Sequence, residues 1–224
     1  MTILSEQSIR EFEHYLKNGS NDLGIQISEH QTELMAMHAK ELMVWNKKIN
    51  LTAIKDPMKV AEKHFIDSIA PVSFFKNEKG LIDLGSGGGF PGIPIKIMRP
   101  SLKVVLVDSS RKKINFLKHV IRTLHLENIE AFHSRVEDLH ENKAYQNKFD
   151  AVISRAFADL SSFVELAAPF LNKTGTIYAM KGKNAKQEIT SEMLNNFNLT
   201  FDHYTLPFEK SDRFVIKLSD NVGP

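Results

Sequence analysis

Two aspartates and a run of glycines form the clearest chemical pattern in the sequence. Asp83 ends a short apolar run, the glycine loop of residues 85–89 follows it, and Asp108 ends the next apolar run. Glycines directly after a buried strand let the backbone approach a ligand closely. An acid at the tip of the second strand can accept hydrogen bonds from both hydroxyls of a ribose. The pattern therefore predicts an adenosine-containing cofactor, bound where two strands end.

The residues around the loop distinguish between two kinds of adenosine cofactor. Residues 87–92 fit the dinucleotide pattern G-x-G-x-x-G, but Pro91 and Pro94 crowd that turn and remove N–H donors that a pyrophosphate needs. The frame that begins two residues earlier has Phe90 in place of its third glycine. Asp83 can accept from the amino group of a methionine moiety. We therefore expect S-adenosylmethionine, with a nicotinamide or flavin nucleotide and a purely structural glycine turn as the alternatives.

Alternating strand and helix patterns place these motifs at one edge of a sheet. Short apolar runs predict buried strands, and apolar residues three to five positions apart predict helices. We expect strands at 81–84, 104–107, 128–132, 149–154, 175–180, 199–206 and 213–218, and helices at 111–125, 160–171 and 185–196. The last two strands are expected to form an antiparallel hairpin. The predicted fold is α/β, a Rossmann-like class I methyltransferase with a mostly parallel seven-stranded sheet.

The N-terminal third is expected to be helical. Ser28 and Gln31 resemble a capping box at the start of a helix. Its apolar stripe consists of Leu34, Met37, Leu42, Trp45 and Ile49. A break near Pro57 precedes a second helix at about 58–75. We expect residues 1–76 to form a helical extension packed on a methyltransferase core of residues 77–224.

Composition excludes several classes of protein. The sequence has no cysteine, which excludes disulfides, cysteine-based zinc sites and a thiol nucleophile. No apolar run approaches the ~20 residues that span a bilayer, and the start lacks the pattern of a signal peptide. We therefore expect a cytoplasmic protein. Net charge is +2, but eight Lys/Arg against one acid lie between Lys96 and Arg122, which suggests an anionic partner or a solvated helix face.

Several separated motifs resemble the RsmG (GidB) methyltransferases, which methylate N7 of a guanine in bacterial 16S ribosomal RNA. The resemblance runs from about Leu42 to Leu218, and no motif position departs from the family pattern. The matching segments are 45–52 (WNKKINLT), 64–68 (HFIDS), 85–94 (GSGGGFPGIP), Asp108-Ser109 with Lys112-Lys113, 134–137 (SRVE), 154–158 (SRAFA) and Lys181-Gly182.

The resemblance implies the cofactor contacts that the residues alone leave open. It places them on Gly85, Phe90, Val136, Glu137 and Arg155. Phe90 would offer an apolar wall, Glu137 would bind the adenine amino group, and Val136 would donate through its backbone. Without the family, an ordinary polar loop is the favoured explanation of Val136 and Glu137. With the residues of the loop and strand motifs, the expected cofactor-binding set is Asp83, Gly85, Gly87, Phe90, Asp108, Ser109, Val136, Glu137 and Arg155.

The absence of some residues narrows the reaction. Methylation of pyrimidine C5 usually needs a cysteine nucleophile, and the sequence has none. Exocyclic-amine methyltransferases carry an Asn/Asp-Pro-Pro-aromatic element where this chain has 154–157 (SRAF). Guanine N7 carries no proton, so positioning and field can supply the rate without a general base. We expect Arg155 to be the catalytic residue, bridging cofactor and substrate, with an internal salt bridge, for example to Glu137, as the alternative.

Two groups of residues are expected to contact the RNA that the family implies. The first ends the N-terminal helix, where helix termination explains Asn and Lys equally well. The second flanks the cofactor edge on two predicted helices, one that begins at Pro91 and the one at 111–125. The expected RNA-binding residues are Asn46, Lys47, Lys48, Lys96, Arg99, Arg111, Lys112, Lys113 and Lys181.

Partners and alternatives follow from the same residues. We expect 16S ribosomal RNA, naked or within the small subunit, as the partner, with no membrane and no obligate protein partner. No metal is expected, because His64 and Asp67 lie three apart and a buried hydrogen bond between them is the simpler explanation. The alternatives are a methyltransferase of the same fold acting on a small molecule or protein, and a non-catalytic cofactor- or RNA-binding module.

Overall fold

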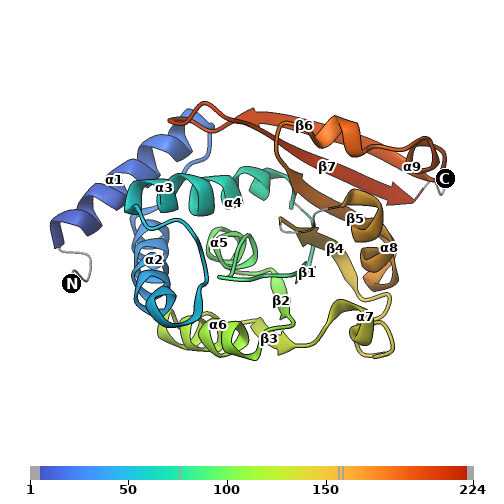
Figure 1. Ribbon diagram of the computed structural model, residues 1–224, viewed down its shortest axis with the longest axis horizontal. Helices are drawn as coiled ribbons and strands as arrows, with labels where there is room; N and C mark the ends of the chain where they lie inside the picture. The colour runs from blue at the N-terminus through green and yellow to red at the C-terminus, as the bar shows by residue number, and fades with distance from the viewer. Residues whose placement is uncertain (1–5, 76, 156, 158, 221–224) are drawn as a thin grey trace.

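A seven-stranded sheet forms the centre of the molecule (Figure 1). The structure is a computed structural model that describes residues 6–75, 77–155, 157 and 159–220. The strands are β1 (Gly80–Leu84), β2 (Lys103–Asp108), β3 (Ile129–His133), β4 (Phe149–Ser154), β5 (Leu171–Lys181), β6 (Phe197–Thr205) and β7 (Asp212–Asp220). Every strand expected from the sequence is present, with ends that differ by a few residues.

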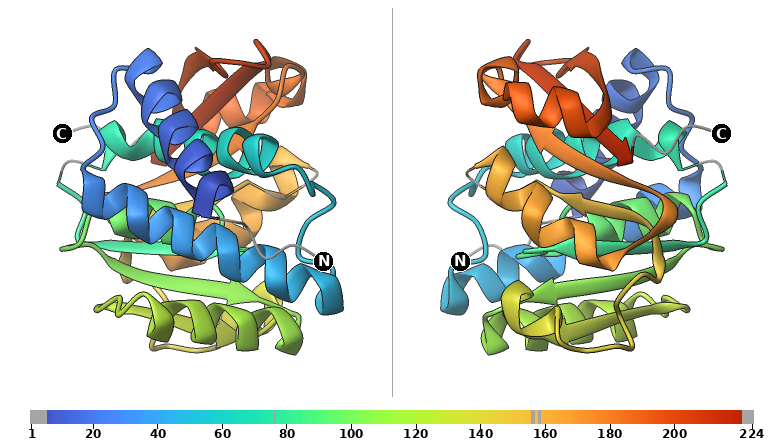
Figure 2. Two further views of the ribbon diagram at one scale, coloured as in Figure 1. Left: turned by 90° about the vertical axis from the view of Figure 1, so that its left-hand side faces the viewer. Right: turned by 90° about the vertical axis from the view of Figure 1, so that its right-hand side faces the viewer.

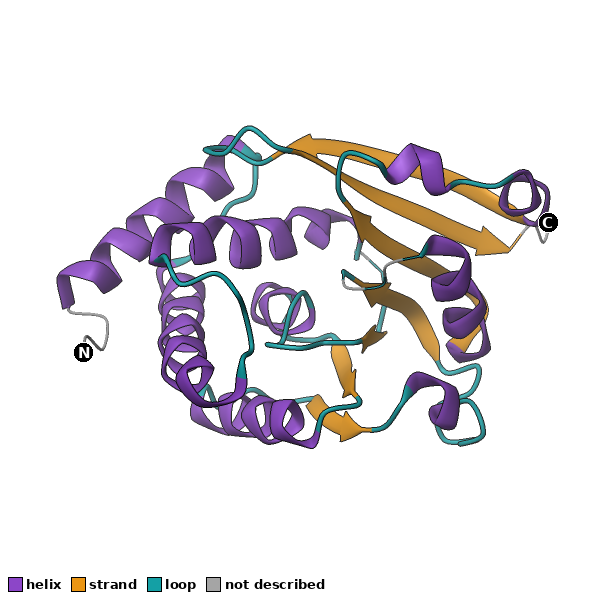
Figure 3. Ribbon diagram, in the orientation of Figure 1, coloured by secondary structure: helices purple, strands orange, loops and turns teal. Residues whose placement is uncertain are grey.

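Strand order explains why the motifs meet at one edge. The order is β3-β2-β1-β4-β5-β7-β6. Strands β1 to β5 are parallel, and β7 pairs antiparallel with β5 and with β6. The chain order therefore reverses between β1 and β4, and ligands of such sheets bind outside the carboxyl ends of the strands at this point. The predicted mostly parallel sheet with a C-terminal hairpin is confirmed (Figure 3).

Helices cover both faces of the sheet (Figure 2). They are α1 (Glu6–Asp22), α2 (Glu29–Ile49), α3 (Pro57–Val60), the π-helical segment η1 (Ala61–Ile66), α4 (Asp67–Ile69), η2 (Ala70–Phe74), α5 (Gly92–Met98), α6 (Arg111–Thr123), α7 (Val136–Leu139), α8 (Leu160–Ala167), η3 (Ala168–Phe170), η4 (Ala185–Glu188) and α9 (Ser191–Asn196). In the described residues, no helix is long and apolar enough to cross a membrane.

Local sequence explains where the main N-terminal helix begins and ends. Ser28 accepts from the backbone of Gln31, whose side chain accepts from the backbone N–H of Ser28, so the predicted capping box is present. The helix ends at Asn50, which adopts the left-handed conformation that asparagine tolerates better than most residues. Helix α1 was not predicted, and the helix expected at 58–75 is a chain of short segments with a π-helical part in its middle.

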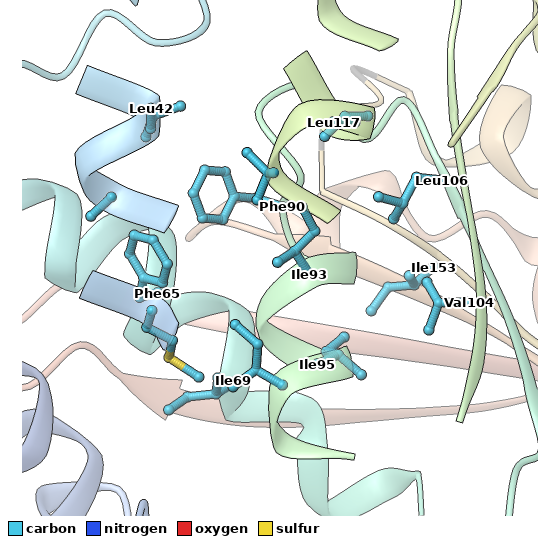
Figure 4. Packing of buried hydrophobic residues seen from close by; sticks show 14 of the residues in the cluster. Leu42, Phe65, Ile69, Phe90, Ile93, Ile95, Val104, Leu106, Leu117 and Ile153 are labelled. Atoms are coloured by element: carbon cyan, nitrogen blue, oxygen red, sulfur yellow. The ribbon is translucent and has the colours of Figure 1, made fainter. Parts of the chain in front are cut away.

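The N-terminal helices share a hydrophobic core with one face of the sheet. Leu42 of α2 and Phe65 of η1 belong to the same buried cluster as Ile93 of α5, Leu106 of β2 and Leu117 of α6 (Figure 4). A second buried cluster on the other face joins the sheet to α8, η4 and α9. The N-terminal segment is thus packed directly against the elements that hold the glycine loop.

Candidate active site

The glycine loop leaves β1 as a tight turn that only glycines adopt easily. Gly85, Gly87 and Gly89 have φ values of +78°, +57° and +90°. The backbone N–H groups of Gly85 and Ser86 donate to the carbonyl oxygen of Val107 on β2, at 2.8 and 3.0 Å. These bonds fix the loop across the carboxyl ends of β1 and β2, where the sequence predicts it.

Asp108 holds the loop and the start of the following helix together. Its Oδ2 accepts from the backbone N–H of Gly87 at 3.0 Å, and its Oδ1 accepts from that of Ser110 at 2.8 Å. Lys113 lies on the first turns of α6 with its Nζ 3.7 Å from Oδ2. Each carboxylate oxygen keeps a second lone pair, so Asp108 can still accept from ribose hydroxyls.

Asp83 is fully buried behind the loop, and its two oxygens differ. Oδ2 accepts from the backbone N–H of Gly92 at 2.9 Å, whereas Oδ1 has no hydrogen-bond partner among the described residues. A Cβ on Gly92 would lie 2.7 Å from that Oδ2 and 2.3 Å from Leu106, so the close approach requires glycine. Burial raises the pKa of the Asp83 carboxyl to about 7, against the lowering effect of the Gly92 hydrogen bond.

A pocket of about 430 Å³ opens next to these residues at the carboxyl ends of β1, β2 and β3. This volume is in the usual range for small-molecule sites. Val136 is buried and Glu137 is exposed at the start of α7, and Ser109 is exposed after β2. The lining residues are Gly85, Val107, Asp108, Ser109, Lys113, Ser134, Arg135, Val136, Glu137 and Phe157.

These residues fit S-adenosylmethionine. Asp83 supplies a buried carboxylate oxygen without a partner in the described part of the chain, which suits the amino group of a methionine moiety. Gly85 leaves open backbone, since the nearest atom to a Cβ there would be on the Phe157 ring at 3.9 Å. Asp108, Val136 and Glu137 line one pocket, as expected for a ribose and an adenine.

Phe90 lies elsewhere than predicted. Its side chain is 6% exposed and does not line the cofactor pocket. The rings of His38 and His64 stack on it with centroids at 4.9 and 4.7 Å, and Phe65 meets it edge-on at 5.1 Å. The expected aromatic wall beside the cofactor is therefore corrected: the Phe90 ring joins the loop to the N-terminal helices (Figure 4).

Arg155 follows β4, but its guanidinium group points to the N-terminal segment. Nη1 donates to the carbonyl oxygen of Lys63 at 2.8 Å and lies 3.4 Å from Asp67 Oδ2, while Nη2 donates to His64 Nδ1 at 3.1 Å. The side chain is only 20% exposed. The sequence predicted a guanidinium directed at cofactor and substrate. The structure corrects this, because both terminal nitrogens have protein partners, and the ion pair is to Asp67 rather than to Glu137.

The contacts of Arg155 explain the π-helical segment. Arg155 takes the carbonyl oxygen of Lys63, which a regular helix would use internally, and the N–H of Asp67 bonds to Glu62, five residues earlier. Segments of this kind often occur at functional sites.

The expected bond between His64 and Asp67 is not among the interactions of either residue. His64 Nε2 instead donates to Thr52 at 2.8 Å, and Asp67 Oδ1 accepts from Tyr204 at 2.8 Å.

Three of the expected RNA contacts have internal roles. Asn46 exchanges two hydrogen bonds with the backbone of Thr52. Lys96 is 2% exposed and donates to the carbonyl oxygens of Pro100 and Leu102 at 2.7 and 2.6 Å, and burial lowers its pKa. Lys181 donates to the carbonyl oxygen of Phe157 and to Glu188. The structure thus gives these three side chains partners inside the protein, which argues against the predicted contacts with RNA.

The other expected RNA contacts remain at the surface. Lys47, Lys48, Arg111 and Lys112 are exposed, and Arg99 is partly exposed. Lys113 is partly exposed and paired with Asp108.

Ala156 and Ala158 of the 154–158 motif lie outside the described residues. Across the described residues, no group of three or more His, Asp or Glu side chains is placed to hold a metal ion.

Sequence reasoning missed two residues that shape the site. His38 Nε2 donates to the carbonyl oxygen of Gly88 at 2.8 Å, and the side chain is fully buried. Its position on the apolar stripe of α2, between Leu34 and Leu42, was the available signal. Phe157 lines the pocket and stacks on Phe163 at 5.2 Å. The sequence indicates Phe157 only as a member of the motif at 154–158.

Comparison with known proteins agrees with this geometry. The family model described as rRNA small subunit methyltransferase G matches residues 31–216. Ribosomal RNA small subunit methyltransferase G of Oceanobacillus iheyensis is 40% identical over 216 residues, which cover 93% of this chain and 89% of the relative. The protein of the same name from Geobacter sp. strain M21 is 44% identical over 95% of this chain and 100% of its own.

A solved structure supports the fold independently. A SAM-dependent methyltransferase from Aquifex aeolicus superposes with a TM-score of 0.55 at 16% identity, over 75% of this chain and 96% of that one. The architecture is therefore the Rossmann-like fold of S-adenosylmethionine-dependent methyltransferases. With a family model that spans most of the chain, this protein belongs to the rRNA small subunit methyltransferase G family.

Proposed function

We propose that this protein transfers a methyl group from S-adenosylmethionine to N7 of a guanine in bacterial 16S ribosomal RNA. The observation that carries the proposal is a cofactor-sized pocket lined by Gly85 and Asp108, with a buried Asp83 oxygen behind the glycine loop that has no partner in the described residues. The relatives of this chain are named for small-subunit ribosomal RNA. We further propose that residues 77–224 bind the cofactor and that the helical extension of residues 1–76 completes the site.

The proposed roles of the cofactor-binding residues follow from their chemistry. When bound, S-adenosylmethionine supplies an electrophilic methyl group on a sulfonium. The Asp83 carboxylate accepts from the amino group, and Asp108 accepts from the ribose hydroxyls while it holds the loop through Gly87. Val136 offers a backbone donor and Glu137 a carboxylate to the adenine. Ser109 and Gly85 complete the lining of the pocket.

The proposed reaction needs orientation rather than proton transfer. Guanine N7 has a free lone pair, so the chain must hold that atom in line with the methyl group and exclude water. No general base is assigned. Arg155 is a positioning residue in this proposal, because it ties the end of β4 to residues 63–68 beside the glycine loop.

Exposed cations provide the proposed surface for RNA. Lys47 and Lys48 end α2, and Arg111 and Lys112 begin α6, so all four can reach phosphates near the carboxyl edge of the sheet. The substrate is proposed to be 16S ribosomal RNA as naked RNA or within the small subunit, in the cytoplasm.

The test is methyl transfer to ribosomal RNA from cells that lack this protein. Labelled S-adenosylmethionine, the purified protein and either naked 16S RNA or small subunits are incubated, and the RNA is digested for mass spectrometry. We expect 7-methylguanosine at one nucleotide, with the two substrates separating naked RNA from the assembled particle. Cofactor binding without incorporation into either substrate, or methylation at another atom, would overturn the proposal.

A further inference from the structure

Three aromatic rings and a lysine gather on the β6–β7 hairpin, outside the site described above. We name Phe201, His203, Phe214 and Lys186 the aromatic patch. His203 and Phe214 are directly paired across the two strands, with ring centroids 5.0 Å apart, and the Phe201 ring lies 6.5 Å from that of Phe214. Phe201 and His203 are two residues apart on one strand, so both side chains project from the same face of the sheet.

A cation lies over two of these rings. Lys186 Nζ is 5.0 Å from the centroid of Phe201 and 5.9 Å from that of Phe214. Lys186 comes from η4, which follows β5, so the patch combines side chains from two separate parts of the chain. Cation–aromatic contacts at these distances are attractive, and the lysine remains exposed.

The rings are accessible rather than buried. Phe201 is 43% exposed, and the side chain of His203 is 49% exposed. Single exposed apolar residues are common and need no explanation. An exposed phenylalanine that adjoins two more rings and a lysine is a more specific arrangement, because an aromatic ring can stack on a base and a lysine can pair with a phosphate.

The aromatic patch lies at the same edge of the sheet as the cofactor pocket. Phe214 pairs with Lys181, the last residue of β5, so it stands at the carboxyl end of that strand. Lys181 donates to the carbonyl oxygen of Phe157 at 2.9 Å, and Phe157 lines the pocket. From β1, which leads into the pocket, β7 is three strand spacings away, or roughly 14 Å, and β6, which carries Phe201, is four, or roughly 19 Å. Figure 1 shows β7 and β6 continuing the sheet beyond β5.

We propose that the aromatic patch stacks an unpaired base of the substrate RNA while the target guanine lies at the cofactor pocket. The proposal rests on the proposed function, which supplies the RNA. Base stacking needs an accessible aromatic ring, and Phe201 is 43% exposed with Lys186 on one side of it. The adjoining phosphate needs a cation, which Lys186 provides. The carboxylate of Asp212 pairs with His203 Nε2 at 2.7 Å, at the edge of the imidazole ring. It therefore pairs with His203, and the positive charge of Lys186 stays available to a phosphate.

The chemistry favours single-stranded RNA over a protein or a duplex. Proteins recognise unpaired loops by splaying bases onto aromatic side chains, whereas duplex RNA is contacted through its backbone and minor groove. The four exposed cations near the cofactor edge have no aromatic residue between them in either segment, so they suit phosphates: Lys47, Lys48, Arg111 and Lys112. The patch thus adds a base contact that those cations cannot make.

The test measures RNA affinity with probes that separate bases from phosphates. One probe is a labelled adenosine RNA of about 12 nucleotides, and the other has the same length with abasic sugars. Phe201→Ala is expected to weaken binding of the adenosine RNA by about tenfold and to leave the abasic probe unaffected. Phe201→Trp is expected to restore binding, with quenching of the new tryptophan by the stacked base. Phe201→Leu keeps an apolar side chain and should behave like alanine.

Controls separate this proposal from folding and from the proposed function. Leu194→Ala removes an apolar residue that is 58% exposed on α9, outside the patch, and should change neither probe. Thermal unfolding and sedimentation velocity are measured for each variant. Equal affinity of Phe201→Ala and wild type for the adenosine RNA overturns the proposal. If wild type self-associates and Phe201→Ala is a monomer, the patch is a protein–protein contact, and the proposal is overturned as well.

Assays of methyl transfer distinguish failure of the stacking proposal from failure of the proposed function. If wild type methylates 16S RNA and Phe201→Ala does so with unchanged KM, the patch proposal fails while the proposed function stands. If Phe201 stacks the adenosine probe but wild type modifies no ribosomal guanine, the proposed function fails while the stacking site stands. If Phe201→Ala raises KM for 16S RNA by about tenfold and retains kcat, both the stacking proposal and the proposed function are supported.

Discussion

Asp83 is a buried carboxyl group whose second oxygen has no partner in the described part of the chain. Its ionisation in that position is costly, which is why its pKa rises to about 7 from the usual 3.8. An ammonium group beside Oδ1 offsets this cost, since a charge-assisted hydrogen bond is stronger than a neutral one. The residue therefore links cofactor affinity to pH.

We expect the affinity for S-adenosylhomocysteine, which has the same amino group, to fall by about tenfold for each pH unit below 7. The ionised carboxylate is the form that binds the ammonium, so acid weakens binding; above about pH 8 the ligand amine itself begins to lose its proton. Asp83→Asn should bind more weakly by about 1.5–3 kcal/mol at neutral pH and lack the acid limb. Titration calorimetry at several pH values tests this, and an unchanged acid limb in Asp83→Asn would contradict it.

Arg155 has a structural role that its sequence position does not reveal. We expect Arg155→Ala to lower the free energy of unfolding by about 1–3 kcal/mol, because the carbonyl oxygen of Lys63 loses its donor. A drop in Tm of roughly 2–10 °C follows for a chain of this size. Methyl transfer should fall as well, since residues 63–68 lose their anchor to β4.

Arg155→Lys is the matched control for charge. A lysine reaches one acceptor but cannot reproduce the planar fork, so a partial recovery of Tm and activity is expected. Thermal unfolding and single-turnover methylation well below Tm measure the two effects. Wild-type Tm with abolished methylation would contradict this account and restore the direct contact with substrate that the sequence suggested.

Prediction from sequence succeeds for residues whose place follows from strand order. Gly85 follows β1 and Asp108 ends β2, and parallel neighbouring strands end at one edge, so their meeting could be predicted. Lys96 and Lys181 could not be assigned correctly. Their partners are carbonyl oxygens at Pro100 and Phe157 and the carboxylate of Glu188, which depend on how loops fold locally.

At the level of elements, α2 and η1 support the glycine loop through two neutral imidazoles. His38 of α2 and His64 of η1 both stack on Phe90, and His38 bonds to the carbonyl oxygen of Gly88. Burial lowers the pKa of His38 to about 4 and that of His64 to about 3. Both rings are held neutral in the folded protein and take up a proton more readily in the unfolded chain, so acid opposes this packing.

His38→Phe isolates one of these imidazoles. In the wild type the unfolded chain takes up the His38 proton near pH 6.5 and the folded chain only near pH 4, so stability from this group is complete above pH 6.5 and is lost as pH falls. The loss by about pH 5 is about 2 kcal/mol. Phenylalanine leaves the Gly88 carbonyl unpaired, which costs about 1–3 kcal/mol at neutral pH.

The expected result is a variant that is less stable than wild type at about pH 7 but loses less on acidification. Urea unfolding at both pH values measures the difference in free energy of unfolding. Asp83 affects the pH dependence of stability in the opposite direction. Because its pKa is raised to about 7, the folded protein binds this proton more readily than the unfolded chain between about pH 4 and 7, so acid favours the folded state. Asp83 is present in both proteins and cancels in the comparison. Equal pH dependence of variant and wild type would contradict the role of His38.

Elements with a strong apolar period could be predicted, and those set by tertiary contacts could not. The stripe and capping box of α2 gave its position, because both lie within the element. The π-helical segment η1 arises from Arg155, which is distant in sequence and draws the carbonyl of Lys63 out of the helix. Helix α7 has only four residues, too few to show a period.

For the whole molecule, helix packing collects positive charge at the edge that holds the cofactor pocket. Helices α2 and α6 run antiparallel, since Glu41 pairs with His119 and Trp45 contacts Phe116. The C-terminal end of α2 therefore lies beside the N-terminal end of α6. This brings Lys47 and Lys48 close to the start of α6, although net charge over the whole chain is only +2.

The salt dependence of RNA binding tests this arrangement. Each phosphate contact that is removed should reduce the slope of log affinity against log salt by about 0.7–0.9, so Lys47→Gln with Lys48→Gln should reduce it by about 1.4–1.8. Lys143→Gln with Lys148→Gln removes the same charge from exposed positions before β4, at the opposite edge of the sheet, and is the matched control. Filter binding of 16S RNA over roughly 50–200 mM salt measures both slopes. If the two double variants lower the slope equally, the attraction comes from net charge alone, and the edge formed by α2 and α6 has no special part in holding the RNA.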